Sequence, residues 1–157
     1  MRAFEHRLVL VVVTGAGAGY FPRFPGTVGT VAAIPLSLGL NHLASFSSPL
    51  ALLLLAGFIT AAIVLSTKAS ELLGNKDPGI IVIDEIAGFL VANFLATPKL
   101  IPLLLAFVIF RILDVAKVFP ASRLEKLPGG GGIVLDDVAA GLYTFAMLHL
   151  FAYLDLV

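Results

Sequence analysis

Charged residues and cysteine are what this chain has least of. Only 13% of its 157 residues are charged, whereas charged residues make up about 25% of a typical soluble domain. Ten Lys and Arg balance ten Asp and Glu, so no net charge favours a nucleic-acid partner. The absence of cysteine excludes disulfide bonds, thiolate metal ligands and a cysteine nucleophile.

Apolar residues dominate the composition instead. They make up 59% of the chain, and its mean hydropathy is +1.06, which is typical of a membrane protein. The length indicates one compact unit over residues 1–157. The apolar run Leu8 to Val13 is short and leads into a glycine-rich loop rather than a cleavage site. We therefore expect no cleaved signal peptide.

Five apolar segments approach the length of a membrane-spanning helix, which is about 17 to 20 residues. They are Val28 to Phe46, Leu50 to Thr67, Ile81 to Ala96, Leu100 to Val115 and Ile133 to Leu154. The third and fourth are short, so we expect them to be tilted, partly immersed or buried among the others. The sequence thus predicts an all-α membrane bundle of about four to five helices.

The basic residues indicate how the bundle is oriented. With a cytoplasmic N-terminus, every Lys and Arg except Lys99 falls on the cytoplasmic side, as the positive-inside rule requires. The same assignment places the glycine-rich loop, the starts of the third and fifth segments and the end of the fourth on that face. We therefore expect a multi-pass protein whose active site faces the cytoplasm.

Acidic residues occur at the starts of two apolar segments. Asp84 with Glu85 in "GIIVIDEIAG", and Asp136 with Asp137 in "GIVLDDVAAG", each follow a Gly-Ile step and precede a small residue and a glycine. Both pairs begin helices that run in the same direction. Asp114 returns to that depth at the end of the fourth segment, so the sequence predicts five carboxylates at one depth.

Carboxylates in a membrane helix are costly, at about 2.5 to 3.5 kcal/mol each at the bilayer centre. Adjacent carboxylates also repel, so a divalent cation is the simplest way to keep them ionised. An all-oxygen set favours a hard ion, Mg2+ first and Mn2+ or Ca2+ after it. The alternative is that these acids are ordinary helix caps. That alternative suits one pair alone, whereas five acids at one depth favour a metal site.

Basic side chains accompany the acids. Arg111, Asp114 and Lys117 recur every three residues in "FRILDVAKVFP", which places them near one another on a helix. We expect Arg111 and Lys117 to contact a phosphate group, with a salt-bridge ladder as the alternative. Arg123 and Lys126 fit plain loop charge better.

A glycine-rich loop, "TGAGAGYFPRFPGTVGT", begins at Thr14 and leads into the first apolar segment. Glycine lets backbone N–H groups approach an anion, and a helix N-terminus favours negative charge. Its candidate phosphate-binding residues are Arg23, Thr27 and Thr30. A plain membrane-entry loop explains this segment equally well by itself, because it is neither a Walker loop nor a Rossmann fingerprint.

Together, "TGAGAGYFPRFPGTVGT", "DPGIIVIDEIAG", "FRILDVAKVFP" and "GGGGIVLDDVAAG" resemble, in order and spacing, the blocks of the bacterial phosphatidylglycerophosphatase A family. The matching residues are Pro25, Gly26, Thr27, Gly29, Asp84, Glu85, Gly88, Arg111, Asp114, Lys117, Gly132, Asp136, Asp137 and Gly141. One departure is Val118, where many members have proline. The resemblance implies a Mg2+-dependent phosphatase of the bacterial cytoplasmic membrane that converts the phospholipid phosphatidylglycerophosphate to phosphatidylglycerol.

The resulting hypothesis is metal-assisted hydrolysis of a phosphomonoester. Its predicted metal ligands and catalytic residues are Asp84, Glu85, Asp114, Asp136 and Asp137. Direct attack by water and an aspartyl-phosphate intermediate are both compatible with these residues.

Two other functions use acids within membranes. A phosphatidyltransferase acting on CDP-activated alcohols also uses Mg2+, but its Asp-Gly-x-x-Ala-Arg motif is absent from the sequence. A non-enzymatic carrier also places acids in the membrane, but its pathway should continue to the far side. That side offers only His42, Lys99 and His149.

Overall fold

The computed structural model describes residues 2–156, which form helices and no strand. The elements are α1 (Arg2–Val13), the 3-10 helix η1 (Ala18–Tyr20), α2 (Pro25–Phe46), α3 (Ser48–Leu73), α4 (Ile83–Ala92), α5 (Leu100–Ala116), α6 (Ala121–Leu124) and α7 (Gly130–Tyr153). The predicted all-α class is confirmed. The five predicted segments correspond to α2, α3, α4, α5 and α7, whereas α1 and α6 are additional helices.

Within residues 2–156, three helices are long and apolar enough to cross a membrane. They are α2, α3 and α7, with 22, 26 and 24 residues, which at about 1.5 Å per residue exceed the roughly 30 Å hydrocarbon core. The predicted third span, Ile81 to Ala96, is wrong in length. Its helix α4 has only 10 residues and rises about 15 Å, so α4 cannot cross a bilayer.

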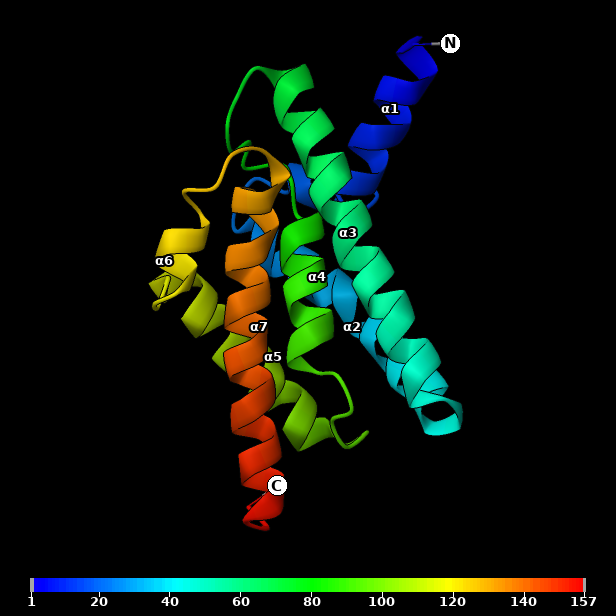
Figure 1. Ribbon diagram of the computed structural model, residues 1–157, viewed down its shortest axis with the longest axis vertical. Helices are drawn as coiled ribbons and strands as arrows, with labels where there is room; N and C mark the ends of the chain where they lie inside the picture. Colours follow the sequence, from blue (N-terminus) through cyan, green and yellow to red (C-terminus); the bar gives the residue numbers. More distant parts are fainter. Residues whose placement is uncertain (1, 157) are drawn as a thin grey trace.

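The short helix α4 is the centre of the bundle. It packs against α7, α2, α3 and α5, and Figure 1 shows it between the longer helices. Every residue of α4 except Asp84 and Glu85 is buried. Of the alternatives expected for this segment, burial among the other helices is therefore the one observed.

Two glycines let α4 and α7 approach each other closely. A Cβ atom on Gly88 would lie 2.7 Å from the Asp137 carbonyl oxygen and from the Phe110 ring, and one on Gly141 would overlap the Gly88 carbonyl oxygen. Only glycine fits where two backbones meet in this way. The contact fixes the register of the two helices that carry the acidic pairs.

The C-terminal end of α4 lies inside the bundle, where a hydrogen-bond network satisfies its backbone. The Asn41 side chain of α2 donates to the Asn93 carbonyl oxygen at 2.7 Å and accepts from the Leu95 N–H at 2.9 Å. Asn93 in turn donates to the Ser37 hydroxyl at 3.1 Å. Because unsatisfied backbone groups are costly away from water, this network explains how a helix can end there.

The N-terminal end of α4 is held by the glycine-rich loop. The Val82 N–H donates at 2.9 Å to the carbonyl oxygen of Val13, the last residue of α1 and the one directly before this loop. A Cβ atom on Gly19 would overlap the Ile80 carbonyl oxygen, and one on Gly29 would lie 2.7 Å from the Val82 side chain. The loop therefore packs directly beneath the chain that leads into Asp84 and Glu85.

The contact between α4 and α7 predicts a stability effect. We expect Gly141→Ala to lower the free energy of unfolding by about 1–3 kcal/mol, because the added methyl group must push the helices apart. Unfolding in detergent, followed by circular dichroism, measures the change. The matched control is Gly57→Ala in α3, where a Cβ atom meets nothing within 4 Å. Equal stability of the two variants would contradict the close-packed interface.

Candidate active site

The acidic pairs of α4 and α7 face each other near the N-terminal ends of their helices. One carboxylate oxygen from each of Asp84, Glu85 and Asp137 lies within 4.8 Å of the other two. Asp84 and Glu85 occupy the first turn of α4, and the Gly88 and Gly141 contact brings α7 beside them. These three residues are called the acidic trio below.

The carboxylates of the site are largely withdrawn from solvent. Asp136 and Asp137 are 4% and 3% exposed, and Asp114 is 7% exposed. One oxygen each of Asp84, Glu85, Asp136 and Asp137 is buried without a hydrogen-bond partner among the described residues. Buried polar atoms normally have partners, and a buried anion is costly without compensation.

The unpartnered oxygens fit a divalent cation. The three residues of the acidic trio offer hard oxygen donors close enough to share one ion, and Mg2+ prefers such donors. The donor set contains no sulfur or nitrogen ligand, so it does not favour a soft transition metal.

Two basic residues compensate part of the acidic charge. Arg111 donates from Nη1 to Asp114 Oδ2 at 2.5 Å and lies 3.8 Å from Glu85 Oε1. Lys117 donates to Asp136, and its Nζ also lies 3.7 Å from Asp114 Oδ1. The same Nζ is 3.8 Å from an Asp137 oxygen, so Lys117 connects the acids of α5 and α7.

The five predicted acids thus occupy one site in two settings. Asp84, Glu85 and Asp137 form the trio, whereas Asp114 and Asp136 make the short contacts to Arg111 and Lys117. A helical repeat on α5 brings Arg111 and Asp114 together, as the sequence indicates. Lys117, just beyond the end of α5, pairs with Asp136 of α7, and the sequence pattern does not predict this pairing.

Lys117 lies just beyond α5, outside the membrane-spanning helices, with its backbone in the left-handed region at φ 47°. Burial lowers the pKa of its ammonium group. The hydrogen bond to Asp136 and the charges of Asp137, Asp136 and Asp114 outweigh burial, so the pKa of Lys117 is raised above its ordinary value. Lys117 is therefore a permanent positive charge at neutral pH.

The glycine-rich loop reaches the site through Gly26. A Cβ atom there would overlap Glu85 Oε1 and lie 3.2 Å from Arg111 Nη1. Of the predicted phosphate-binding residues in this segment, Arg23 is exposed and Thr27 is half-buried. Thr30 is fully buried, and its hydroxyl donates to the Gly26 carbonyl oxygen at 2.9 Å. Its proton is therefore already used within α2.

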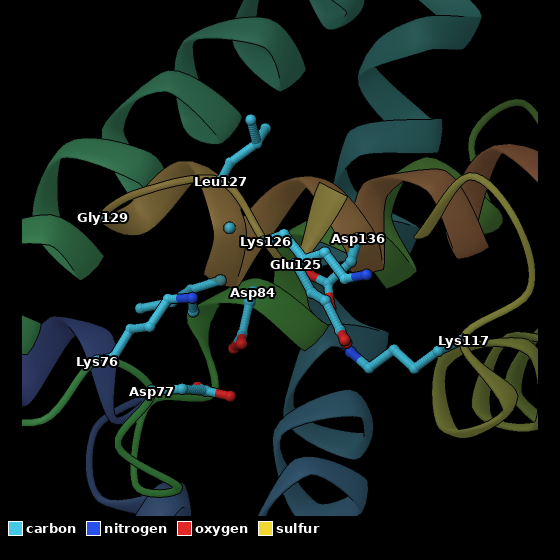
Figure 2. A pocket seen from close by; sticks show the side chains of 11 residues that line it. Lys76, Asp77, Asp84, Lys117, Glu125, Lys126, Leu127, Gly129 and Asp136 are labelled. Atoms are coloured by element: carbon cyan, nitrogen blue, oxygen red, sulfur yellow. The ribbon is translucent and has the colours of Figure 1, made fainter. Parts of the chain in front are cut away.

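A cavity of about 310 Å³ opens beside the acidic trio. Asp84, Asp136 and Lys117 line it, together with Lys76 and Lys126 from two loops. Figure 2 shows Lys76 and Asp77 on one side of Asp84 and Lys117 on the other.

The positions of Lys76 and Lys126 could not be found by motif reading, because both lysines lie in polar loops and match none of the helical spacings. From the sequence alone, Lys126 fits plain loop charge, and Lys76 contributes only to the predicted orientation. The available signal was that each loop directly precedes a helix with an acidic pair.

Comparison with known proteins shows the family of the chain. The family model for phosphatidylglycerophosphatase A matches residues 11–152, which include all the acids and bases described above. The chain belongs to the phosphatidylglycerophosphatase A family. It is therefore a phosphatase, and the transferase and carrier interpretations are set aside. No solved structure matches the chain.

Three curated proteins are similar in sequence to this chain. A Bacteroides thetaiotaomicron protein, provisionally named phosphatidylinositol-3-phosphatase, is 34% identical over 90% of this chain and 91% of its own length. Phosphatidylglycerophosphatase A of Escherichia coli is 33% identical, covering 88% of this chain and 80% of that protein. Phosphatidylglycerophosphatase A of Haemophilus influenzae is 32% identical, covering 91% of this chain and 88% of that protein.

The acidic trio predicts separable effects on turnover and stability. We expect Asp84→Asn and Asp137→Asn each to lower phosphatase turnover by at least about 100-fold, because each removes a negative charge from the set that would bind a cation. Stability without metal should be unchanged or higher, since carboxylate repulsion falls. Stabilisation by added Mg2+ in thermal unfolding should be lost.

Asp155→Asn, at an exposed position near the C-terminus, is the control for both measurements. Turnover by Asp84→Asn or Asp137→Asn at the level of this control would show that the trio is misassigned.

The ion pairs of Lys117 lead to a second prediction, which concerns stability. We expect Lys117→Met to lower the free energy of unfolding by roughly 1–3 kcal/mol, because Asp136 is left buried without its partner. This loss of stability is smaller than that expected for a fully buried ion pair, because the Lys117 side chain is 38% exposed. Since the folded-state pKa is raised, the stabilisation is complete below the ordinary value of 10.5 and disappears only at higher pH.

Detergent unfolding at pH 8 measures this difference, with the exposed Lys99→Met as control. A Lys117→Met variant as stable as Lys99→Met would show that the ion pair does not support the site.

Proposed function

We propose that this protein hydrolyses the terminal phosphate of phosphatidylglycerophosphate in a Mg2+-dependent reaction and releases phosphatidylglycerol and inorganic phosphate. Membership of the phosphatidylglycerophosphatase A family supports the substrate. The observation that carries the metal dependence is the convergence of the acidic trio, with buried carboxylate oxygens that lack partners in the described chain.

The residues of the trio would hold the metal. Asp84, Glu85 and Asp137 each provide an oxygen at the required mutual distance. Mg2+, when bound there, supplies charge neutralisation at the phosphoryl oxygens. In the reaction, the oxygen of water forms a bond to phosphorus. The bond from phosphorus to the terminal glycerol oxygen breaks, and that oxygen takes up a proton.

The remaining residues of the site position the trio. Arg111 holds Glu85 and Asp114 from one side, and Lys117 holds Asp114, Asp136 and Asp137 from the other. Gly26 leaves room for the Glu85 carboxylate against the start of α2. Such fixed charges favour phosphoryl transfer, which depends mainly on positioning and electrostatic stabilisation.

The substrate's chemistry fits a site at the membrane surface. Phosphatidylglycerophosphate and phosphatidylinositol 3-phosphate, the lipids in the relatives' names, both carry a phosphomonoester that a polyol separates from the phosphodiester. We propose that the acyl chains stay in the bilayer while the phosphomonoester reaches the acidic trio. Nearly all Lys and Arg residues fall in segments on the same predicted side of the membrane as the acids, which supports a cytoplasmic active site.

The test is an assay of phosphate release by the purified protein in detergent micelles that contain phosphatidylglycerophosphate. We expect release with Mg2+ and none after chelation with EDTA, with activity restored by excess Mg2+. Phosphatidylinositol 3-phosphate in the same assay measures substrate preference. Release that persists undiminished in EDTA would contradict the metal dependence. No release from phosphatidylglycerophosphate under any condition would contradict the substrate.

A further inference from the structure

The cations predicted to bind phosphate are already engaged by acids of the site. Arg111 contacts Asp114 and Glu85, and Lys117 contacts three aspartates. Together these two residues offset only part of five carboxylate charges. A phosphate dianion that approaches the trio therefore meets a net negative surface. Even with a divalent cation bound, it needs further positive charge at the cavity.

Two cations at the cavity are free to supply that charge. Lys76, between α3 and α4, and Lys126, between α6 and α7, both line the 310 Å³ cavity that contains Asp84. Both lysines are exposed, and no ion pair joins either one to a carboxylate within residues 2–156. Their ammonium groups can therefore turn toward an anion without breaking an existing contact.

We propose that Lys76 and Lys126 form a phosphate-binding subsite at the mouth of this cavity. The subsite holds the terminal phosphomonoester of the lipid as it arrives and the inorganic phosphate as it leaves. This inference rests on the proposed function for the identity of the lipid, whereas binding of inorganic phosphate tests the subsite by itself. Lysine suits the role, because a flexible point charge can follow a phosphate that moves.

The position of the subsite explains how the two products separate. Phosphatidylglycerol stays in the bilayer, whereas inorganic phosphate is soluble and must leave through an opening toward water. The cavity is bounded by the loops that hold Lys76 and Lys126, and Figure 2 shows Lys76 and Asp77 beside Asp84. Phosphate released at the trio would therefore pass these lysines.

Two acids at the cavity limit the strength of the subsite. Asp77 and Glu125 also line it, so the lysine charges act in a mixed field rather than a strongly positive one. Weak binding is what product release requires. The acids also allow a control of opposite charge. Removal of a negative charge near a bound phosphate cannot weaken the electrostatic attraction between the protein and the phosphate.

The experiment measures binding of inorganic phosphate to the full-length protein in detergent with saturating Mg2+, by calorimetry or by phosphorus NMR line broadening. We expect Lys76→Gln and Lys126→Gln each to raise Kd about three- to tenfold, the range for one partly exposed charged hydrogen bond. The variant with both substitutions should bind phosphate more weakly than either single variant. Lys76→Arg and Lys126→Arg should retain binding, and Glu125→Gln should not weaken it.

The control is Lys99→Gln, which removes an exposed lysine that does not line this cavity. A second arm measures hydrolysis of phosphatidylglycerophosphate. We expect KM to rise in the two glutamine variants while kcat stays within about twofold, because the trio is intact.

Each outcome decides one proposal. Phosphate affinity and KM in both glutamine variants equal to those of Lys99→Gln would overturn the subsite, even if Mg2+-dependent hydrolysis is present. Lysine-dependent phosphate binding by a wild-type protein that does not hydrolyse the lipid would support the subsite and contradict the proposed substrate. Weakened phosphate binding with an unchanged KM would limit the subsite to the departing phosphate and overturn its role in substrate capture.

Discussion

Repulsion among carboxylates in an apolar bundle is the constraint on which the rest of this structure depends. Asp84, Glu85, Asp114, Asp136 and Asp137 converge at the N-terminal ends of two packed helices. Such a cluster is destabilising unless cations compensate it. Arg111 and Lys117 provide part of the compensation from α5. One buried oxygen of each residue of the trio lacks a hydrogen-bond partner among the described residues. A bound cation would relieve the repulsion, and the same acids would then suit phosphoryl transfer.

The architecture keeps these charges in register. Gly88 and Gly141 bring α4 and α7 into backbone contact, and Gly26 and Gly29 let α2 pack beneath the acidic turn. At the other end, Asn41 satisfies the backbone where α4 stops. A ten-residue helix held at both ends places Asp84 at the cavity, while α2, α3 and α7 provide the length to cross the membrane.

Much of this arrangement follows from local sequence. Asp84 and Glu85 occupy a helix start, as predicted. The same prediction is wrong for Asp136 and Asp137, because α7 begins at Gly130, about two turns earlier. The spacing of Arg111 and Asp114 correctly predicts one helical face, whereas Lys117 lies just beyond the end of α5. The length of α4 does not follow, because residues 86–96 are apolar except for Asn93. The end of α4 depends on hydrogen bonds from Asn41, more than fifty residues earlier. The division of the acids between the trio and the ion pairs likewise depends on how α5 and α7 pack. Hydropathy and spacing do not contain that information, nor do they place Lys76 and Lys126 at the cavity.

The proposed function requires Asp84, Glu85 and Asp137 together to bind a divalent cation. Anomalous diffraction from crystals of the active protein soaked in Mn2+, a substitute for Mg2+ with a measurable anomalous signal, tests it most directly. We expect a peak among these three carboxylates that disappears in Asp137→Asn. A Mn2+-supported enzyme whose peak lies elsewhere, with none at the trio, would contradict it.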